Sequence, residues 1–468
     1  MQKNQEFIST VSKMGSNGEA IIKDEGKVVF VPFAIAGEKI KYKVLKVTNK
    51  IAYGKLLEVL TPAEERVRPK CSVFGKCGGC QLQHVKYASQ LKIKEENVKN
   101  AFSKIANLEV DVKPTVKGIS EWGYRNKLQL PVGVVNGETV IGFYAENSHR
   151  IIPIEDCPIN ASWTKNVITA FKKYVSEYNV KGYDESSHSG DLREITVKEI
   201  KGNLIITVVT LTRELSNKDG LIDILKSQLK YNFSLYQNVN NKKTNVIYGD
   251  DFNLLYGSPD YTADMLGIKY KIGVRSFMQV NTSVCSKLYS AVKEACMINE
   301  NTTVIDAYSG AGLMTALLSK DAKKGYGVEI IPEAVNCAND LARLNGLSEK
   351  ISNYVGKCED IIPDIIAKEK RENADICLVL DPPRKGCDRK VIESIIDSDI
   401  DRIVYVSCMP STLARDVGLL VGSLKFTENG IENVDNPTHK YKVDLVKPFD
   451  MFSQTKHVET LVVLTKLK

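Results

Sequence analysis

The 468-residue sequence contains no run of about 18 apolar residues, and no apolar segment lies within residues 1–30. The first absence argues against a membrane-spanning helix and the second against a secretory signal. Internal repeats and low-complexity tracts are also absent. We therefore expect a cytosolic globular protein with no membrane partner, and its length predicts two or three domains.

Negative charge is scarce in the N-terminal part of the sequence. The net charge of the chain is +7, and residues 1–130 contain 23 Lys and Arg against 13 Asp and Glu, whereas the remainder contains 41 against 44. A localised positive surface attracts polyanions, which favours nucleic acid over an acidic metabolite as the partner. A solvated lysine-rich surface without a ligand is the alternative.

The sequence has eleven cysteines, and in a reducing compartment we expect no disulfide framework. Cys71, Cys77 and Cys80 lie within "CSVFGKCGGC", and Cys157 follows in "EDCPI". Glycines beside the first three let the backbone fold tightly around a metal, and Pro158 follows the last cysteine as in ferredoxin-like ligation. Four thiolates suit zinc or an iron–sulfur cluster, although a single C-x₂-C pair is unusual for zinc.

Three regions follow from the spacing of apolar runs and turn residues. Residues 5–60 alternate short apolar runs with turn signals, which predicts an all-β barrel of about five strands, domain 1–60, with lysines on outward positions. Residues 61–265 mix predicted strands and helices, including a helix near 86–105, and are expected to form a central α/β domain. Residues 266–468 form the third expected domain.

Strands and helices alternate regularly from about residue 280. The pattern predicts strands at 302–306, 324–329, 375–380 and 402–406, each followed by a helix. Such alternation implies a Rossmann-like α/β fold, in which helices cover both faces of a parallel sheet. Ligands of these sheets bind at the carboxyl ends of the strands, so the residues that follow the strands are the candidates for function.

The first two of these strands end in a pattern that predicts S-adenosylmethionine binding. "TVIDAYSGAGLMT" places Asp306 at a strand end before Gly310 and Gly312, and these glycines let a ligand approach the backbone closely. The loop lacks the full G-x-G-x-x-G pattern and a P-loop lysine, which disfavours a pyrophosphate and favours a cationic ligand. Glu329 ends the next strand, where its carboxylate can accept both ribose hydroxyls. Structural glycines in another doubly wound enzyme are the alternative.

The third strand ends at Asp381 in "CLVLDPPRKG". Two consecutive prolines lock the backbone and remove two N–H donors, so the loop should be a stiff ledge. Such a ledge suits a surface that holds a planar base against a methyl donor. An ordinary Asp-Pro-Pro turn is the alternative.

The fourth strand ends just before Cys408 in "VSCMPSTLARD". A helix that begins near Pro410 points its N-terminal amides toward this thiol, and we expect them to lower its pKa below the free value of about 8.5. A thiolate is what uracil chemistry needs, because sulfur addition at carbon 6 makes an enolate whose carbon 5 attacks a sulfonium methyl. A buried structural cysteine is the alternative.

Glu459, in "KHVETLVVL", begins a last apolar strand. A carboxylate there can remove the carbon 5 proton after methyl transfer, so that the sulfur is eliminated, provided that a closed site raises its pKa. A surface glutamate without a catalytic role is the alternative.

Six motifs occur in this order in the sequence: "SFMQVN", "DAYSGAGL", "GVEI", "DPPRKG", "VSCMPSTLARD" and "HVET". With them the sequence resembles the RNA uracil-5 methyltransferase family, specifically its 23S ribosomal RNA branch, over essentially the whole chain. The resemblance implies an OB-like TRAM barrel at the N-terminus, a central mixed α/β domain, and a C-terminal domain that is an S-adenosylmethionine-dependent methyltransferase.

The resemblance also implies roles for individual residues. Cys408 is the implied nucleophile and Glu459 the implied base. The implied cofactor contacts are Gln279, Tyr308, Glu329 and Asp381, and the implied ligands of a structural [4Fe–4S] cluster are Cys71, Cys77, Cys80 and Cys157. Two departures affect the fine geometry of the pocket: Met409 stands where relatives often have Asn, and Tyr308-Ser309 replaces a common Phe-Cys.

We expect a monomeric enzyme that methylates carbon 5 of a uridine in 23S ribosomal RNA. A transfer-RNA uracil-5 methyltransferase is the nearest alternative, although such enzymes typically lack the barrel and the early cysteines. A non-catalytic RNA-binding assembly factor is the second, and Cys408 and Glu459 argue against it. Candidates for phosphate and base contacts are Lys41, Tyr42, Lys43, Lys46, Tyr53, Lys55, Trp122, Tyr124, Arg125 and Lys127.

Overall fold

Segments that are far apart in the sequence build each of the two units of the protein. The computed structural model describes residues 1–372, 374–398, 400–435 and 440–467. Unit 1 consists of Met1–Gln90, Ser120–Tyr261 and Phe452–Lys456, and unit 2 consists of Leu91–Ile119, Thr262–Met451 and His457–Lys468. Within the described ranges, no helix combines the length and the apolar character that crossing a membrane requires.

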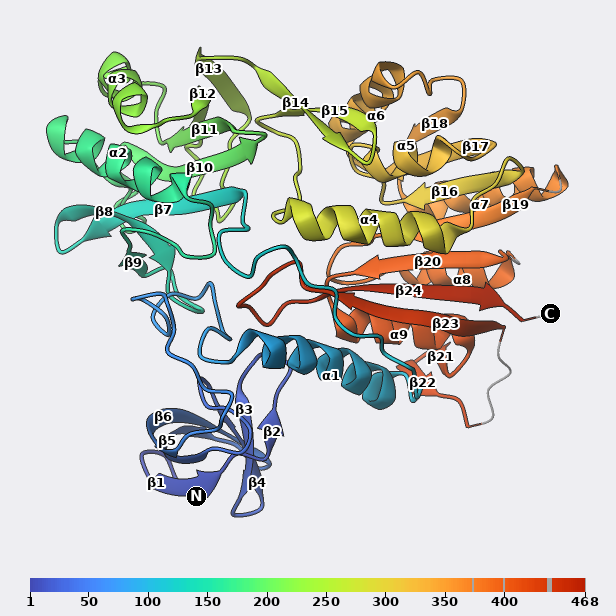
Figure 1. Ribbon diagram of the computed structural model, residues 1–468, viewed down its shortest axis with the longest axis horizontal. Helices are drawn as coiled ribbons and strands as arrows, with labels where there is room; N and C mark the ends of the chain where they lie inside the picture. Colours follow the sequence, from blue (N-terminus) through green and yellow to red (C-terminus); the bar gives the residue numbers. More distant parts are fainter. Residues whose placement is uncertain (373, 399, 436–439, 468) are drawn as a thin grey trace. The chain divides into compact units, whose positions relative to one another are not determined.

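The first segment of unit 1 forms a six-stranded sheet in the order β1-β5-β6-β4-β3-β2 (Figure 1). Along β5, Ile40, Tyr42 and Val44 are buried while the alternating lysines lie outside the core, as the two-residue period of a strand requires. The predicted all-β domain is confirmed, with β2 as an additional strand of two residues. The strands are β1 (Glu6–Thr10), β2 (Lys13–Met14), β3 (Ala20–Asp24), β4 (Lys27–Val31), β5 (Lys39–Val47) and β6 (Ile51–Thr61).

A seven-stranded mixed sheet in the order β13-β12-β11-β10-β7-β8-β9 forms the rest of unit 1. Helices α2 (Trp163–Glu177) and α3 (Lys218–Gln228) pack against one face of it in a common apolar core. The sequence did not predict α2, since its Ser162 N-cap makes no capping hydrogen bond and its first turn has no acidic residue. The strands are β7 (Lys127–Val135), β8 (Glu138–Tyr144), β9 (Ile151–Pro153), β10 (Leu192–Ile200), β11 (Asn203–Thr210), β12 (Asn232–Val239) and β13 (Asp251–Tyr256).

Unit 2 is built on a seven-stranded sheet in the order β18-β17-β16-β19-β20-β24-β23. The predicted parallel strands are confirmed, and β24 is the strand of this sheet that runs against the other six. The strands are β16 (Thr302–Ala307), β17 (Lys324–Glu329), β18 (Ile351–Val355), β19 (Asp375–Leu380), β20 (Arg402–Ser407), β23 (Tyr441–Phe449) and β24 (Glu459–Lys466). Two small antiparallel pairs are β14 (Asp260–Met265) with β15 (Ile268–Gly273), and β21 (Leu424–Thr427) with β22 (Gly430–Asn433).

Helices cover both faces of this sheet, as expected for a doubly wound fold (Figure 1). Helices α1, α7, α8 and α9 share one apolar core with the strands, and α4, α5 and α6 lie on the other face. The helices are α1 (Tyr87–Ile105), α4 (Thr282–Cys296), α5 (Leu313–Ser319), α6 (Pro332–Leu344), α7 (Cys358–Arg371), α8 (Arg389–Asp397) and α9 (Pro410–Val421).

The placement of α1 differs from the sequence-based expectation, which assigned residues 61–265 to a central domain. The helix forms where it was expected, but Leu91–Ile119 belongs to unit 2. Val98, Phe102 and Ala106, spaced four residues apart, are buried in the core that also contains α9. A helical period in the sequence reveals an apolar face, but it does not reveal which core receives that face.

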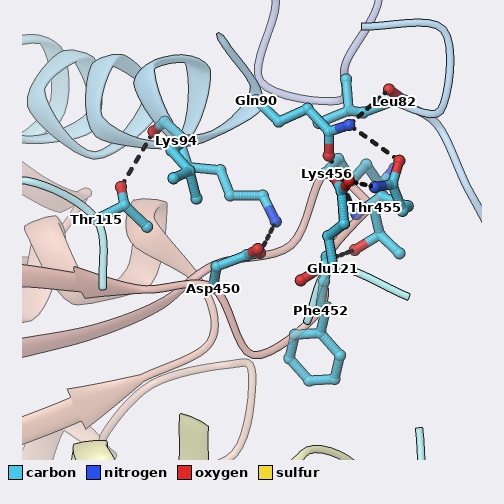
Figure 2. A network of polar contacts seen from close by, with 12 residues as sticks. Leu82, Gln90, Lys94, Thr115, Glu121, Asp450, Phe452, Thr455 and Lys456 are labelled. Carbon is cyan, nitrogen blue, oxygen red and sulfur yellow. Dashed lines mark hydrogen bonds and ion pairs between the residues drawn. The ribbon is translucent and has the colours of Figure 1, made fainter. Parts of the chain in front are cut away.

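The segment Phe452–Lys456 is held within unit 1 by a network of hydrogen bonds centred on Gln454. Figure 2 labels its partners Gln90, Leu82 and Glu121. The Gln454 backbone N–H donates to Gln90 Oε1 at 3.1 Å, and Gln90 Nε2 donates to Gln454 Oε1 at 2.9 Å and to the Leu82 carbonyl at 3.1 Å. Gln454 Nε2 also donates to Glu121 at 3.1 Å. Both amide side chains are buried, so this short segment is firmly fixed within its unit.

Within unit 2, the side chains of Lys94 on α1 and Asp450 after β23 form an ion pair, and both side chains are 0% exposed (Figure 2). Removing one partner of a buried pair leaves an uncompensated charge, so we expect Lys94→Met to lower the free energy of unfolding by about 3–5 kcal/mol. Urea unfolding followed by circular dichroism measures this change.

A matched control is Lys113→Met, which removes one partner of the exposed pair Lys113–Asp111. It should change the free energy of unfolding by less than about 0.5 kcal/mol. Equal effects of the two substitutions would show that the buried pair does not support the packing of α1.

Candidate functional site

The carboxyl ends of the parallel strands bring the candidate residues of unit 2 to one edge of the sheet. Ala307 at the end of β16 is level with Val328 of β17 and with Leu380 of β19. The next residues along these strands, Tyr308, Glu329 and Asp381, therefore form one row at this edge.

Cys408 and Glu459 come together because β24 is antiparallel to β20. Ser407 pairs with Thr460 in the ladder between these strands. One step further along the same register, the residue after Ser407 is opposite the residue before Thr460, and these are Cys408 and Glu459. Opposed residues of an antiparallel pair have Cβ atoms about 4.5–5.5 Å apart, so the ladder delivers the thiol and the carboxyl to one place.

The predicted fall in the pKa of Cys408 is wrong for this structure. Burial raises the pKa of the half-buried thiol, and the negative charge of Glu459 raises it further. Helix α9 supplies little compensation, because its first residue is Pro410, which has no N–H, and the Met409 N–H donates to Ser407 Oγ at 3.1 Å.

Arg384 opposes these effects, and sequence reasoning assigned it no role. Its positive charge and a hydrogen bond to the thiol lower the pKa of Cys408, and its charge also lowers the pKa of Glu459. The available signal was its position directly after the two prolines of the ledge, in a loop that the fold places at this edge.

Glu459 is a buried carboxyl of the site, with 6% of the residue exposed. Burial raises its pKa to about 8, and the charge of Asp381 acts in the same direction. Asp381 as a whole residue is exposed, but its carboxyl group lies among protein atoms. This desolvation raises the pKa of the carboxyl to about 6. A group with a pKa near neutrality can both take up and release a proton under ordinary conditions, which is what a general base must do.

Asp306 and Glu329 organise the loop after β16. Asp306 is buried and accepts a hydrogen bond from Thr315 Oγ1 at 2.5 Å, while burial raises its pKa to about 7. Glu329 accepts from the backbone N–H groups of Gly310 at 3.1 Å and Ile331 at 2.9 Å. Three carboxyls, counting Asp381, are thus gathered at one edge, and this excess of negative charge suits a cationic ligand.

The glycines of the loop serve two different purposes. Gly310 has φ +54° and open space where a side chain would point, which agrees with the predicted close approach of a ligand. Gly312 has φ +79°, and a Cβ there would lie 2.6 Å from Ala338 Cβ of α6, so its reason is packing between the loop and a helix. Tyr308 adopts φ +65°, an unusual conformation for a non-glycine residue.

Gln279 lies in the loop between β15 and α4. Among the described contacts, its side chain makes no hydrogen bond or ion pair with the other candidate residues. Its cofactor role stays a prediction.

In unit 1, all four predicted metal-binding cysteines line one cavity of about 720 Å³. The pKa of Cys80 and that of Cys157 are each raised to about 12, mainly by burial and partly by the charges of the other cysteines. The Gly79 N–H donates to Cys77 Sγ at 3.4 Å. In the described ranges no group of three or more Cys, His, Asp or Glu side chains is arranged to hold a metal ion.

The structure corrects one candidate for RNA contact and places others. Tyr42 is fully buried and its hydroxyl donates to Asp24 at 2.9 Å, so it belongs to the core of its sheet. Tyr53 is 46% exposed, as a stacking residue must be. Lys70 lies over the Trp122 ring at 4.6 Å, and the Tyr124 hydroxyl donates to the Ser453 carbonyl at 3.0 Å.

Two family profiles and two similar proteins match this chain. The profile of the tRNA (Uracil-5-)-methyltransferase family matches residues 86–467, and the profile of the TRAM domain matches residues 4–57. Proteins named uncharacterized RNA methyltransferase from Clostridium tetani and Clostridium acetobutylicum are each 39% identical to this chain. The matches cover 99% and 100% of this chain, and 97% and 98% of the relatives.

A solved structure has the same fold along nearly the whole length. The crystal structure of Pyrococcus abyssi tRNA (uracil-54, C5)-methyltransferase in complex with S-adenosyl-L-homocysteine has a TM-score of 0.74 to this chain at 23% identity. The match covers 98% of this chain and 100% of the other. The predicted α/β fold, with an N-terminal β domain before a Rossmann-like methyltransferase domain, is confirmed.

Proposed function

The chain belongs to the tRNA (uracil-5-)-methyltransferase family, and from this premise we propose that it methylates carbon 5 of a uridine in 23S ribosomal RNA. The observation that carries the proposal is the β20–β24 ladder, whose register sets the Cys408 thiol against the Glu459 carboxyl. Arg384 and Asp381 act electrostatically on both groups, which makes this edge a site for proton and sulfur chemistry.

The side chains of the site divide the reaction between them. Cys408, as the thiolate, adds to carbon 6 of uracil, and electrons move to the ring oxygen to give an enolate nucleophilic at carbon 5. Arg384 favours the thiolate by its charge. After carbon 5 has been methylated, Glu459 removes the proton from it, the double bond re-forms, and the Cys408 sulfur leaves.

S-adenosylmethionine supplies the methyl group as a sulfonium cation, and the residues at the sheet edge suit that charge. Asp306, Glu329 and Asp381 bring three carboxyls together, and Gly310 leaves space beside the backbone. We propose Gln279, Tyr308, Glu329 and Asp381 as its contacts.

We propose a structural [4Fe–4S] cluster held by Cys71, Cys77, Cys80 and Cys157. The four thiols line one cavity, and an N–H donor directed at Cys77 Sγ is of the kind that supports cluster thiolates. The single C-x₂-C pair, with the fourth cysteine far away in the sequence, favours the cluster over zinc.

Metal analysis of anaerobically purified protein tests this assignment. Wild-type protein should contain about four iron atoms and acid-labile sulfide, and its solution should be brown. Cys80→Ser should lose most of the iron and the colour. Cys337→Ser, which alters an exposed cysteine on α6, should leave the iron content unchanged. One zinc per chain in the wild type, without iron, would establish the alternative.

Transfer RNA is the second candidate substrate, and a specific observation supports it. The Pyrococcus abyssi enzyme, named for a transfer-RNA uracil, matches 98% of this chain, so the N-terminal barrel does not distinguish the two substrate classes as the sequence argument assumed. The early cysteines and the resemblance to the ribosomal branch favour 23S RNA.

Labelled S-adenosylmethionine, offered with unmodified 23S transcript and with unmodified transfer-RNA transcript, separates the candidates. We expect label in 5-methyluridine of the 23S transcript, and digestion followed by mass spectrometry locates the nucleotide. Label in transfer RNA alone would reverse the substrate assignment, and label in neither would overturn the proposal.

A further inference from the structure

The ledge consists of residues 381–387, which follow β19. It is held by side chains of α9, the helix that begins two residues after the proposed nucleophile Cys408. Thr412 Oγ1 donates a hydrogen bond to the Arg384 carbonyl at 3.1 Å. Arg415 Nη2 donates one to the Lys385 carbonyl at 2.9 Å. Two consecutive backbone carbonyls of the ledge therefore depend on one helix.

A third contact comes from Asp416, which is fully buried. Its Oδ2 accepts hydrogen bonds from the Cys387 N–H at 2.8 Å and from the Tyr405 hydroxyl at 2.6 Å, and its Oδ1 accepts from Arg415 Nε at 2.7 Å. Asp416 thus joins the ledge, β20 and Arg415 in one network. A carboxylate that accepts several hydrogen bonds has little freedom to move.

We call the contacts of Thr412, Arg415 and Asp416 with the ledge the clamp. The sequence of the ledge explains why these contacts are needed and why they fit closely. Pro382 and Pro383 have no N–H groups, so backbone donors cannot anchor that part of the loop. Gly386 has φ +80°, and a Cβ there would lie 2.4 Å from Arg415 Nη2 and 2.5 Å from Asp416 Oδ2. The loop lies against the clamp closely enough that even one methyl group would force it away.

The Arg384 guanidinium hydrogen-bonds to the Cys408 thiol, and its charge acts on both Cys408 and Glu459. We propose that Thr412, Arg415 and Asp416 are positioning residues, which fix the Arg384 guanidinium beside the Cys408 thiol and thereby set the reactivity of that thiol. The inference deepens the proposed function and rests on it, because it takes Cys408 as the nucleophile.

Several charged groups face Cys408 and enter any test of its reactivity. Glu459 on β24 and Asp381 after β19 oppose the thiolate, and Arg384 favours it. Thr412 is uncharged, so Thr412→Val removes a contact to the ledge without changing the charge around the thiol. The Thr412 hydroxyl also donates to the Met409 carbonyl at 3.2 Å, so the double variant with Arg384→Met is needed to separate an effect through the ledge from an effect on the loop that carries Cys408.

The experiment measures the rate of Cys408 alkylation by iodoacetamide against pH, in the free protein, with mass spectrometry of the Cys408 peptide. Arg384→Met should raise the alkylation midpoint by about 1 pH unit, and Thr412→Val should raise it by about 0.5 unit. The double variant should match Arg384→Met alone, because the clamp acts through the guanidinium. Arg415→Lys, which keeps the charge but loses the fork, should resemble Thr412→Val.

The controls use the exposed neighbour Ser411 and the exposed thiol of Cys337. Ser411→Ala should leave the Cys408 midpoint unchanged, and the Cys337 peptide should titrate identically in every variant. An unchanged midpoint in Thr412→Val, or a full additional shift in the double variant, would overturn the inference. Because alkylation needs neither RNA nor methyl donor, these results stand apart from an activity assay of Cys408→Ala, which tests the proposed function itself.

Discussion

Cys408→Ala should reduce methyl transfer by at least about 10⁴-fold, because alanine cannot add to carbon 6 and carbon 5 then remains too weakly nucleophilic to take the methyl group. The register of β20 and β24 places this residue against Glu459. Incorporation of labelled methyl into RNA measures the effect.

The fold should survive the substitution, because Cys408 is half-buried and lies outside the strand ladders. Circular dichroism and the urea midpoint should match those of the wild type. Cys337→Ala provides the control for removal of a thiol elsewhere in the same unit. Turnover within tenfold of the wild type in Cys408→Ala would show that the methylation does not pass through this sulfur.

Glu459→Gln should trap the protein on its RNA. Glutamine has nearly the same shape but cannot accept the carbon 5 proton, so the methylated adduct cannot eliminate the Cys408 sulfur. We expect turnover to fall by about 10²–10⁴-fold and a covalent protein–RNA species to accumulate when RNA and S-adenosylmethionine are both present. A denaturing gel with labelled RNA detects this species as a band of reduced mobility.

Two further variants sharpen the result. The double variant Cys408→Ala with Glu459→Gln should give no such band, and Glu432→Gln on β22, an exposed carboxyl, should turn over normally. If Glu459→Gln abolished turnover without any adduct, the carboxyl would be acting before sulfur addition rather than after it.

The raised pKa of Glu459 also predicts the pH dependence. Burial and Asp381 raise this pKa from 4.5 to about 8, so the basic carboxylate form becomes more populated as the pH rises toward 8. Between these two values the folded state binds more protons than the unfolded state, and the contribution of this group to stability falls as the pH rises. The unfolding temperature of the wild type should therefore fall between pH 5 and pH 8.5. In Glu459→Gln, which lacks this titrating group, the fall should be smaller.

The sequence was sufficient to predict the row of residues at the sheet edge. Apolar strands ending at Asp306, Glu329 and Asp381 imply a parallel sheet, and a parallel sheet brings its carboxyl ends together. Glu459 could be named from its motif, but its partnership with Cys408 depends on the antiparallel direction of β24, which the pattern of a single apolar strand does not encode.

Effects that depend on three-dimensional surroundings were beyond the sequence. The helix after Cys408 suggested a lowered pKa, but burial and the charge of Glu459 outweigh it. Arg384 lies in the motif "DPPRKG", but its effect on the pKa of Cys408 depends on how the ledge folds. Likewise the period of α1 predicted a helix and could not indicate that Val98 and Phe102 would enter the core beside α9.

The interleaving of the two units constrains how this protein can be divided or recombined. The chain passes from one unit to the other five times, and the last excursion, Phe452–Lys456, ends three residues before Glu459. No single cut in the chain yields either unit intact. A chimaera with one crossover point would combine Gln454 from one parent with Gln90 and Glu121 from the other. Domain exchange between relatives must therefore transfer this five-residue segment together with the N-terminal unit, or the strand that begins at Glu459 loses the anchor before it.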